Sequence, residues 1–488
     1  MAFACRNSLP QTGSATILTI AAAIPKTGVD RAGTATLLRL LTLEAPVAAG
    51  WDGRPSGRAF VDWQWLPGNL GLRLRVAKGI RFHDGTLLTN TLAADILRKT
   101  FMPPTVMILS KSVTSITADE ADAVVIQTQQ PEGFLLSDLS TLDFALPGSK
   151  TIGTGPYRHE SEGPPIVLQA FEGYKSGRPR IDTIKIVEYD TQRAAWAAMM
   201  RADANMLHDV SRDAIEFVEA ETSIQTHSFE RGYYDALGFN QRNPMLARRE
   251  VRQALSEAVD RQQIIDLALK KRGSLAKGPF WPYHWALPAN APYYKFDAET
   301  AQRRLDAAGL TVHPSDVPGQ MPSRFRFNCL VTATDQRLQR VALVLQRQLY
   351  DVGIDLDVQP VPFGVFVQRA MRGDFDSLLT ELGSYRSSAL VYTMWHSSLE
   401  PQGPVWNYHT ADAALDQFRR AILDDEVRAA ILNVQQVMYD DPPAVFIDWT
   451  QRARALSRDF QVPVERGRDI LGTIQQWRPA PPAAQARR

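Results

Sequence analysis

The sequence predicts an α/β protein built from two or three lobes, and three observations support this fold class. The chain has 488 residues, which is more than one hydrophobic core usually organises. Hydrophobic residues make up 44% and charged residues 22% of the chain, as in an ordinary globular protein. Segments with helical apolar spacing alternate with short apolar segments, which is the pattern of helices packed against sheets.

The elements expected in the first 156 residues follow this alternation. Residues 17–24 (ILTIAAAI) form an apolar run of strand length, and a Pro-Lys-Thr-Gly turn follows it. Residues 71–82 alternate apolar and charged side chains as a half-buried strand does, and Asp84-Gly85 supplies a turn. The next expected features are a helix over 92–101, a strand over 124–127 and a Gly- and Pro-rich boundary over 147–156.

Amphipathic helices and strands make up the remainder of the chain. The segment 249–269 predicts the strongest helix, because its apolar residues recur every three or four positions. A helix over 297–308 begins after the capping residue Asp297 and ends before Gly309. The other expected elements are strands over 183–188, 233–240, 354–359 and 375–380 and helices over 191–201 and 336–352.

Charge balance and scarce cysteine argue against several classes of protein. Lys and Arg number 54 and acidic residues 53, so a net charge of +1 gives no electrostatic reason to expect a nucleic acid or an anionic membrane as partner. Cys5 and Cys329 are the only cysteines, so neither a disulfide framework nor a zinc site is expected, and no other cofactor is implied. No apolar run reaches the ~18 residues that span a bilayer.

The first residues leave two questions open. Residues 17–24 also fit the core of a short signal peptide, although a buried first strand accounts for both the run and the turn after it. Cys5 is either an incidental cysteine or the lipidated residue of a longer precursor, with residues 7–14 as its tether. No long apolar segment precedes Cys5 in this sequence.

Four stretches share their sequence, order and spacing with one known family. They are Leu72–Thr89 (LRLRVAKGIRFHDGTLLT), Gly153–Tyr157 with the segment 171–182, Leu237–Ile265 and Phe296–Leu310. Each stretch alone is weak evidence, but together with the strand that follows Gly353, Gly373–Asp376 and Asp440–Ile447 the match spans nearly the whole chain. The chain therefore resembles the family 5 solute-binding proteins of ABC importers, which include oligopeptide-, dipeptide- and nickel-binding proteins.

The resemblance implies a two-lobed type II periplasmic-binding fold with an extra subdomain in the first lobe. By this resemblance residues 14–44, 149–240 and 448–488 form the core of the first lobe, 45–148 the inserted subdomain and 241–447 the second lobe. Two strands cross between the lobes, with Gly238-Phe239-Asn240 expected at the first crossing and residues 447–450 near the second. The ligand binds in the cleft, and hinge closure buries it.

The implied function is that of the substrate-binding component of an ABC importer. Such a protein works in the periplasm or at the extracellular face, as a monomer that serves a permease and its ATPase. Two other classes stay open, a cytosolic ligand-sensing module with the same fold and a chaperone-like periplasmic scavenger. An enzyme is not expected, because the sequence lacks HExxH, GxSxG, GxxxxGK and GxGxxG, its eight histidines are scattered, and turn formation accounts for His83-Asp84.

The segment 380–388 (TELGSYRSS) departs from the pattern of the peptide-binding members. Those members carry the motif Asp-Tyr-Pro-Asp-Pro. The first Asp of this motif pairs with the α-amine of the peptide, because a buried ammonium needs a counter-charge. If Tyr385 aligns with the Tyr of that motif, Ser384 replaces the Asp and Arg386 adds a cation, while Glu381 is a substitute anchor.

We therefore expect no binding of peptides through a free α-amine. Arg386 either pairs with a surface carboxylate or binds an acidic or polyhydroxyl ligand, such as an organic acid, an anionic metal chelate or an oligosaccharide.

Aromatic and strand-end residues complete the predicted ligand contacts. Aromatic side chains line small-molecule pockets because they offer rigid apolar area, but they equally form the cores of lobes, and both interpretations stay open. The connection after the first strand often faces the cleft in this architecture. The candidates are Ala23, Tyr234, Asn240, Trp395, Trp406 and Tyr408.

Overall fold

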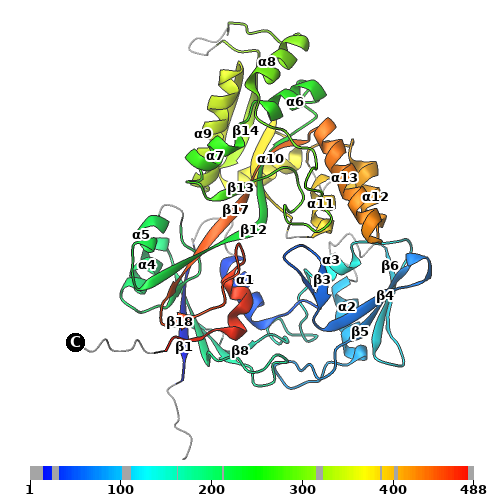
Figure 1. The fold of residues 1–488 in the computed structure, drawn as a ribbon, viewed down its shortest axis with the longest axis vertical. Coiled ribbons are helices and arrows are strands. Elements are labelled where there is room, and N and C mark those ends of the chain that lie inside the picture. The colour runs from blue at the N-terminus through cyan, green and yellow to red at the C-terminus, as the bar shows by residue number, and fades with distance from the viewer. Residues whose placement is uncertain are drawn as a thin grey trace, which may run out of the picture.

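The computed structural model describes residues 15–24, 32–101, 112–161, 163–211, 214–314, 322–384, 387–399 and 405–481. Figure 1 shows an upper and a lower part, which the long strands β12 (Ile224–Phe239) and β17 (Ala444–Ser457) link, and a smaller sheet beside the lower part. The predicted α/β class is confirmed. The division of the residues among lobes, as the resemblance implied it, stays a prediction.

One large sheet runs through the upper and lower parts. Its other strands are β1 (Ile17–Ala23), β8 (Tyr157–Ser161), β9 (Ile166–Ala170), β10 (Thr183–Tyr189), β11 (Met206–Leu207), β13 (Gly273–Leu275), β14 (Phe325–Thr332), β15 (Ile354–Val361) and β16 (Ser377–Gly383). Within the described residues the order of its eleven strands is β15-β14-β16-β12-β17-β11-β1-β10-β9-β8, and β13 pairs with β17.

The strands β12 and β17 belong to both parts of this sheet. In the lower part β17 also pairs with β11, whereas in the upper part β12 pairs with β16 and β17 pairs with β13. Their antiparallel register is interrupted between the pairs Glu230–Gln451 and Tyr234–Trp449. The first crossing lies at this interruption and not at Gly238–Asn240 as predicted, because the later residues of β12 already pair with β16.

The lower part is built on parallel strands. β1 lies between β10 and β11 and is buried at Leu18 and from Ile20 to Ala22, which confirms the predicted strand over 17–24. Thr191 caps a helix by accepting a hydrogen bond from the amide of Ala194 at 3.1 Å. The other elements here are α1 (Ala32–Thr42), α4 (Gln192–Met200), α5 (Ile215–Glu219), β18 (Phe460–Gln461), η5 (Ile470–Gln476) and β19 (Arg478–Pro479).

The smaller subdomain contains β2 (Val47–Ala49), β3 (Pro55–Gly57), β4 (Phe60–Trp65), η2 (Pro67–Asn69), β5 (Gly71–Val76), α2 (Asn90–Phe101), β6 (Val113–Ala118), β7 (Ala123–Thr128) and α3 (Leu135–Leu139). Four of its strands form a sheet in the order β4-β5-β7-β6. The predicted strand over 71–82 was too long, because Gly79 takes a φ of 77° and turns the chain. The predicted turn is confirmed, since Gly85 has a φ of 90° and the Thr86 amide donates to Asp84 at 2.9 Å.

The upper part carries α6 (Arg249–Glu257), α7 (Arg261–Leu267), α8 (Ala298–Ala307), α9 (Gln336–Asp351), α10 (Phe363–Arg372), α11 (Ser388–Trp395), η4 (Ser397–Leu399), α12 (Asp412–Arg420) and α13 (Asp424–Asp440). The helix predicted over 249–269 is two helices, because Asp260 caps the second by accepting from the Gln263 amide at 3.0 Å. Asp297 caps α8 as predicted. Of the helices described here, none is long and apolar enough to cross a membrane.

Apolar contacts join the smaller subdomain to the upper part. The ring centroids of Phe134 and Phe418 are 5.1 Å apart, and those of Trp51 and Trp281 are 5.0 Å apart. Figure 1 shows α12 and α13 reaching from the upper part toward α3 of the subdomain. The buried apolar residues of these two regions form one continuous cluster.

Candidate ligand-binding site

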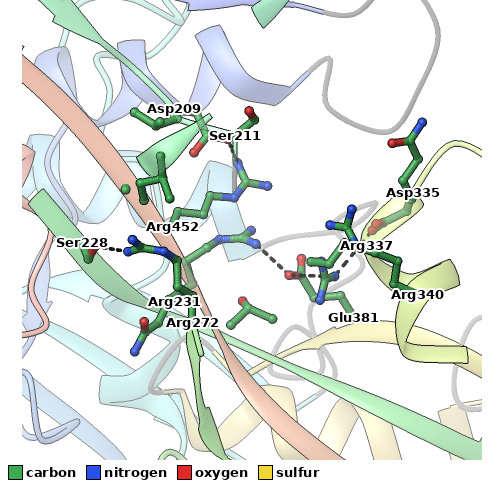
Figure 2. Close-up of a pocket in the computed structure, with 16 residues that line it drawn as sticks. Asp209, Ser211, Ser228, Arg231, Arg272, Asp335, Arg337, Arg340, Glu381 and Arg452 are labelled. Atoms are coloured by element: carbon green, nitrogen blue, oxygen red, sulfur yellow. Dashed lines mark hydrogen bonds and ion pairs between the residues drawn. The ribbon is translucent and has the colours of Figure 1, made fainter. Parts of the chain in front are cut away.

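A cavity of about 290 Å³ lies beside β12 and β17, where these strands pass between the upper and lower parts (Figure 2). Five arginines and three carboxylates are among its lining residues, so the lining carries a net charge of +2 (5 − 3). The charged residues are Asp209 from the lower part, Arg231 and Arg452 from the crossing strands, and Arg272, Asp335, Arg337, Arg340 and Glu381 from the upper part.

The secondary structure explains why these side chains meet. Because β14 and β16 are parallel, their carboxyl ends share one edge of the sheet, and α9 and Glu381 come together there. Asp335 caps α9 by accepting from the amide of Leu338 at 3.0 Å. Arg337 and Arg340 lie three residues apart near the start of this helix and therefore project from one face of it.

Glu381 is held between two arginines. Its carboxylate accepts a hydrogen bond from Nη1 of Arg231 at 2.8 Å and lies 3.7 Å from Nη2 of Arg337. Burial alone would raise the pKa of Glu381, but the positive charges of Arg231, Arg337 and Arg452 hold this pKa below its ordinary value. The carboxylate is therefore ionised and already paired within the protein.

Two buried carboxyl groups lie behind Arg337. Asp235 on β12 and Asp448 on β17 are register partners and are both 0% exposed. Burial raises the pKa of Asp235, although Arg337, which donates a hydrogen bond to it, opposes this rise. Asp235 therefore keeps its proton to a higher pH than an exposed aspartic acid does.

Two further arginines meet carboxylates of the lower part. Nη1 of Arg452 donates to Asp209 at 3.3 Å. Nη2 of Arg272 donates to Glu219 at 3.1 Å, and its Nη1 donates to the hydroxyl of Ser228 at 3.3 Å. Arg272 precedes β13 and Glu219 ends α5, so this ion pair joins the upper and lower parts beside the cavity.

Of the contacts predicted near the peptide-binding motif, Glu381 lines the cavity. Ser384 is buried just after β16, and its amide donates to a backbone carbonyl at 2.7 Å. Ala23 ends β1 and is half-buried, outside the lining of this cavity. Tyr385 and Arg386 lie outside the described residues, so the role inferred for Arg386 stays a prediction.

The other predicted contacts are buried away from the cavity lining. Nε1 of Trp395 donates to the hydroxyl of Tyr234 at 2.9 Å, and the rings of Trp395 and Trp406 stack at 5.6 Å. Tyr408 donates to a backbone carbonyl at 3.0 Å, and Asn240 donates to two such carbonyls at 3.1 and 2.7 Å. These contacts favour the alternative interpretation of the aromatic residues as lobe core, and their ligand-binding role stays a prediction.

Gly238 of β12 packs directly beneath Trp406. A Cβ atom at position 238 would lie 2.3 Å from the indole ring. Gly238→Ala is therefore expected to lower the free energy of unfolding by about 1–3 kcal/mol, as overpacking of a core does. Denaturant titration measures this change, and Trp406→Leu in the same background should recover part of it. An alanine variant as stable as the parent would contradict the packing.

Sequence reasoning missed all five cavity arginines: Arg231, Arg272, Arg337, Arg340 and Arg452. One signal was readable, because Arg337 and Arg340 occupy one face near the start of the predicted helix over 336–352. The other three lie in strands or strand connections, where arginine has no diagnostic spacing. No group of three or more His, Cys, Asp or Glu side chains in the described part of the chain suits a metal ion.

Comparison with known proteins identifies the family. The family model described as "Bacterial extracellular solute-binding proteins, family 5 Middle" matches residues 55–402. The oligopeptide-binding protein AppA of Bacillus subtilis is 24% identical over 454 residues, which cover 84% of this chain and 81% of AppA. The dipeptide-binding protein of Escherichia coli is 23% identical over 365 residues, covering 70% of this chain and 66% of that protein.

Solved structures match the fold over nearly the whole chain. NikA from Brucella suis in complex with Fe(III)-EDTA superposes with a TM-score of 0.79 at 17% identity, covering 95% of this chain and 100% of NikA. AppA from Bacillus subtilis in complex with a nonapeptide superposes with a TM-score of 0.75 at 19% identity, covering 96% of this chain and 100% of AppA. These likenesses confirm the predicted type II periplasmic-binding fold.

The family match also settles the general activity. The family consists of binding proteins, not enzymes, which act in the periplasm or outside the cell and bind peptides or small ligands for an ABC permease. The match covers well over half of this chain. The protein belongs to the family 5 bacterial extracellular solute-binding proteins and is the substrate-binding component of an ABC importer.

Proposed function

We propose that this protein captures one small polar solute in the arginine-lined cavity and delivers it, as a monomer, to an ABC permease and its ATPase. One observation carries this proposal: residues of the upper part, of the lower part and of the linking strands β12 and β17 all line the cavity. A solute that contacts both parts stabilises the state in which they are close together. Attachment to the membrane through a lipid on Cys5 stays a separate prediction, because Cys5 lies outside the described residues.

The size of the cavity favours a small solute. Its volume of about 290 Å³ lies at the lower end of small-molecule sites, which span about 300–1,000 Å³. A nonapeptide, the ligand in the AppA complex, is far larger than this space. The cavity therefore suits a compact metabolite better than a long peptide.

The state of Glu381 argues against recognition of a free α-amine. An ammonium group in a closed cleft needs a carboxylate partner. Glu381 lies three residues before Ser384, the position aligned with the family's amine-binding Asp, and Arg231 and Arg337 already share its charge. An ammonium ligand would have to displace a guanidinium from Glu381 in a cavity whose net charge is already positive.

Closure on the co-purified solute tests the proposed function. Native mass spectrometry identifies the solute, and denaturation followed by refolding removes it. Adding it back is expected to lower the radius of gyration in small-angle scattering. It should also stabilise the native state by about 2.7 kcal/mol at a ligand concentration a hundred times Kd, because only the native state binds. A stabilised protein that does not compact would argue for a rigid binding scaffold.

A further inference from the structure

The cavity presents guanidinium groups on two opposite sides. Figure 2 shows Arg452 beside Asp209 and Ser211 on one side, and Arg337 and Arg340 beside Glu381 on the other. The first side is formed by β17 and the segment after β11, and the second by the start of α9 and the end of β16. A bound solute therefore meets positive charge at both ends.

The lining offers more guanidinium N–H donors than its own carboxylates accept. Three carboxylates line the cavity beside five guanidinium groups, and Asp235 and Glu219 pair with Arg337 and Arg272 from outside the lining. Each guanidinium has five N–H donors in a planar fork, which is more than one carboxylate oxygen accepts. Ser211, Thr450 and Gln451 add neutral polar groups to the lining.

We propose that the solute is a small organic dianion whose two acidic groups bind at opposite sides of the cavity. Arg452 binds one group, and Arg337 and Arg340 bind the other. This inference rests on the proposed function, since it assigns the ligand class of the same cavity. Planar carboxylates match the guanidinium fork with two parallel hydrogen bonds, so dicarboxylates are the first class to test.

The two-sided arrangement also explains how charge drives closure. Arg337 and Arg340 belong to the upper part, and Asp209 and Ser211 belong to the lower part. An anion at one side alone neutralises that side without linking the two parts. A dianion that spans the cavity neutralises both sides at once. It therefore binds the closed state more tightly than the open state and shifts the population toward closure.

Calorimetric titration of ligand-free protein with succinate, glutarate and adipate tests the inference. We expect one chain length to bind best and its monomethyl ester to bind about tenfold to a hundredfold more weakly, because one charge-assisted contact is lost. Sodium sulfate, which offers one anionic centre, should bind more weakly than the best diacid. An analogue of the best diacid in which a phosphonate replaces one carboxylate separates a general dianion site from one that prefers carboxylates.

Charge-removing variants connect the affinity to the two sides. Arg340→Gln and Arg452→Gln are each expected to weaken the best diacid by about tenfold or more. Arg347→Gln is the matched control, because Arg347 lies on the same helix α9, is 74% exposed and pairs with Asp351 at 3.2 Å. This control should bind the diacid as the parent does, and melting curves of all three variants establish that they fold.

The possible outcomes separate this inference from the proposed function. If monoesters or sulfate bind as tightly as the best diacid, or no diacid binds, the dianion assignment is wrong. If the co-purified solute closes the lobes but carries no acidic groups, the proposed function stands and the assignment fails. If neither that solute nor any diacid produces closure, the proposed function and the dianion assignment are both overturned.

Discussion

Arg419→Met is expected to lower the free energy of unfolding by about 3–5 kcal/mol, the usual effect of stranding one partner of a buried ion pair. Arg419 on α12 donates to both oxygens of Glu132 at 2.6 to 2.9 Å, and Glu132 is 0% exposed. Methionine keeps the length of the side chain but removes its charge. Among the residues that the structure describes, the hydroxyl of Ser112, which donates to the buried carboxylate at 3.0 Å, would be its remaining side-chain donor.

A second carboxyl group sharpens this expectation. Asp138 lies close to Glu132, and its pKa is raised well above its ordinary value by burial and by the charge of Glu132. The region therefore tolerates one negative charge only while Arg419 balances it. Because Gly133 also donates its amide to the carbonyl of Arg419 at 2.7 Å, the loss should loosen the contact between the subdomain and α12.

Two controls accompany the measurement by urea titration at pH 7. Arg420→Met changes the neighbouring exposed arginine of α12 and should alter stability by less than about 0.5 kcal/mol. The double variant Glu132→Leu/Arg419→Met removes both charges and should recover much of the loss. Equal effects of the Arg419 and Arg420 changes would show that the ion pair contributes nothing.

Asp448→Asn is expected to stabilise the protein at neutral pH by about 1–2 kcal/mol. In the parent, burial beside Asp448 raises the pKa of Asp235, so the folded protein holds a proton that the unfolded chain releases above pH ~4. The folded state thus binds more protons than the unfolded state, and stability falls as pH rises from there through the raised pKa of Asp235. An amide at position 448 donates to Asp235 at every pH and removes this fall.

The free energy of unfolding measured between pH 4 and 8 decides this prediction. The parent should lose stability across the lower part of that range relative to Asp448→Asn. Asp235→Asn is the contrasting variant, since it removes the buried partner of Arg337 and should destabilise the protein. Parallel pH profiles for the parent and Asp448→Asn would mean that Asp448 does not influence the protonation of Asp235.

Most secondary structure was predictable because its signals are local. The apolar run of β1, the cap at Asp297 and the turn at Asp84-Gly85 depend on residues within a few positions of one another. Errors arose where a local break competed with a longer pattern. Asp260 starts a new helix inside an uninterrupted amphipathic segment, and β5 ends at Val76, before the turn at Gly79, although the alternation continues beyond it.

The cavity was much less predictable, because distant segments build it. Arg231, Arg337 and Arg452 come from two crossing strands and a helix, and the irregular register between those strands brings them together. The aromatic residues posed the same difficulty. Trp406 and Tyr408 could have lined a cleft, and it is contacts with distant segments, such as that of Trp406 with Gly238, that favour the core.

The position of β17 has a consequence for how the protein is made. It is the last strand of the large sheet along the chain, yet it lies inside the sheet between β12 on one side and β11 and β13 on the other. A ribosome therefore releases nearly all of the chain before β17 can join the two halves of the sheet. Domains usually fold in order as they emerge. Here the pairing that unites the two halves must wait for one late segment, so the continuous sheet forms only near the end of synthesis.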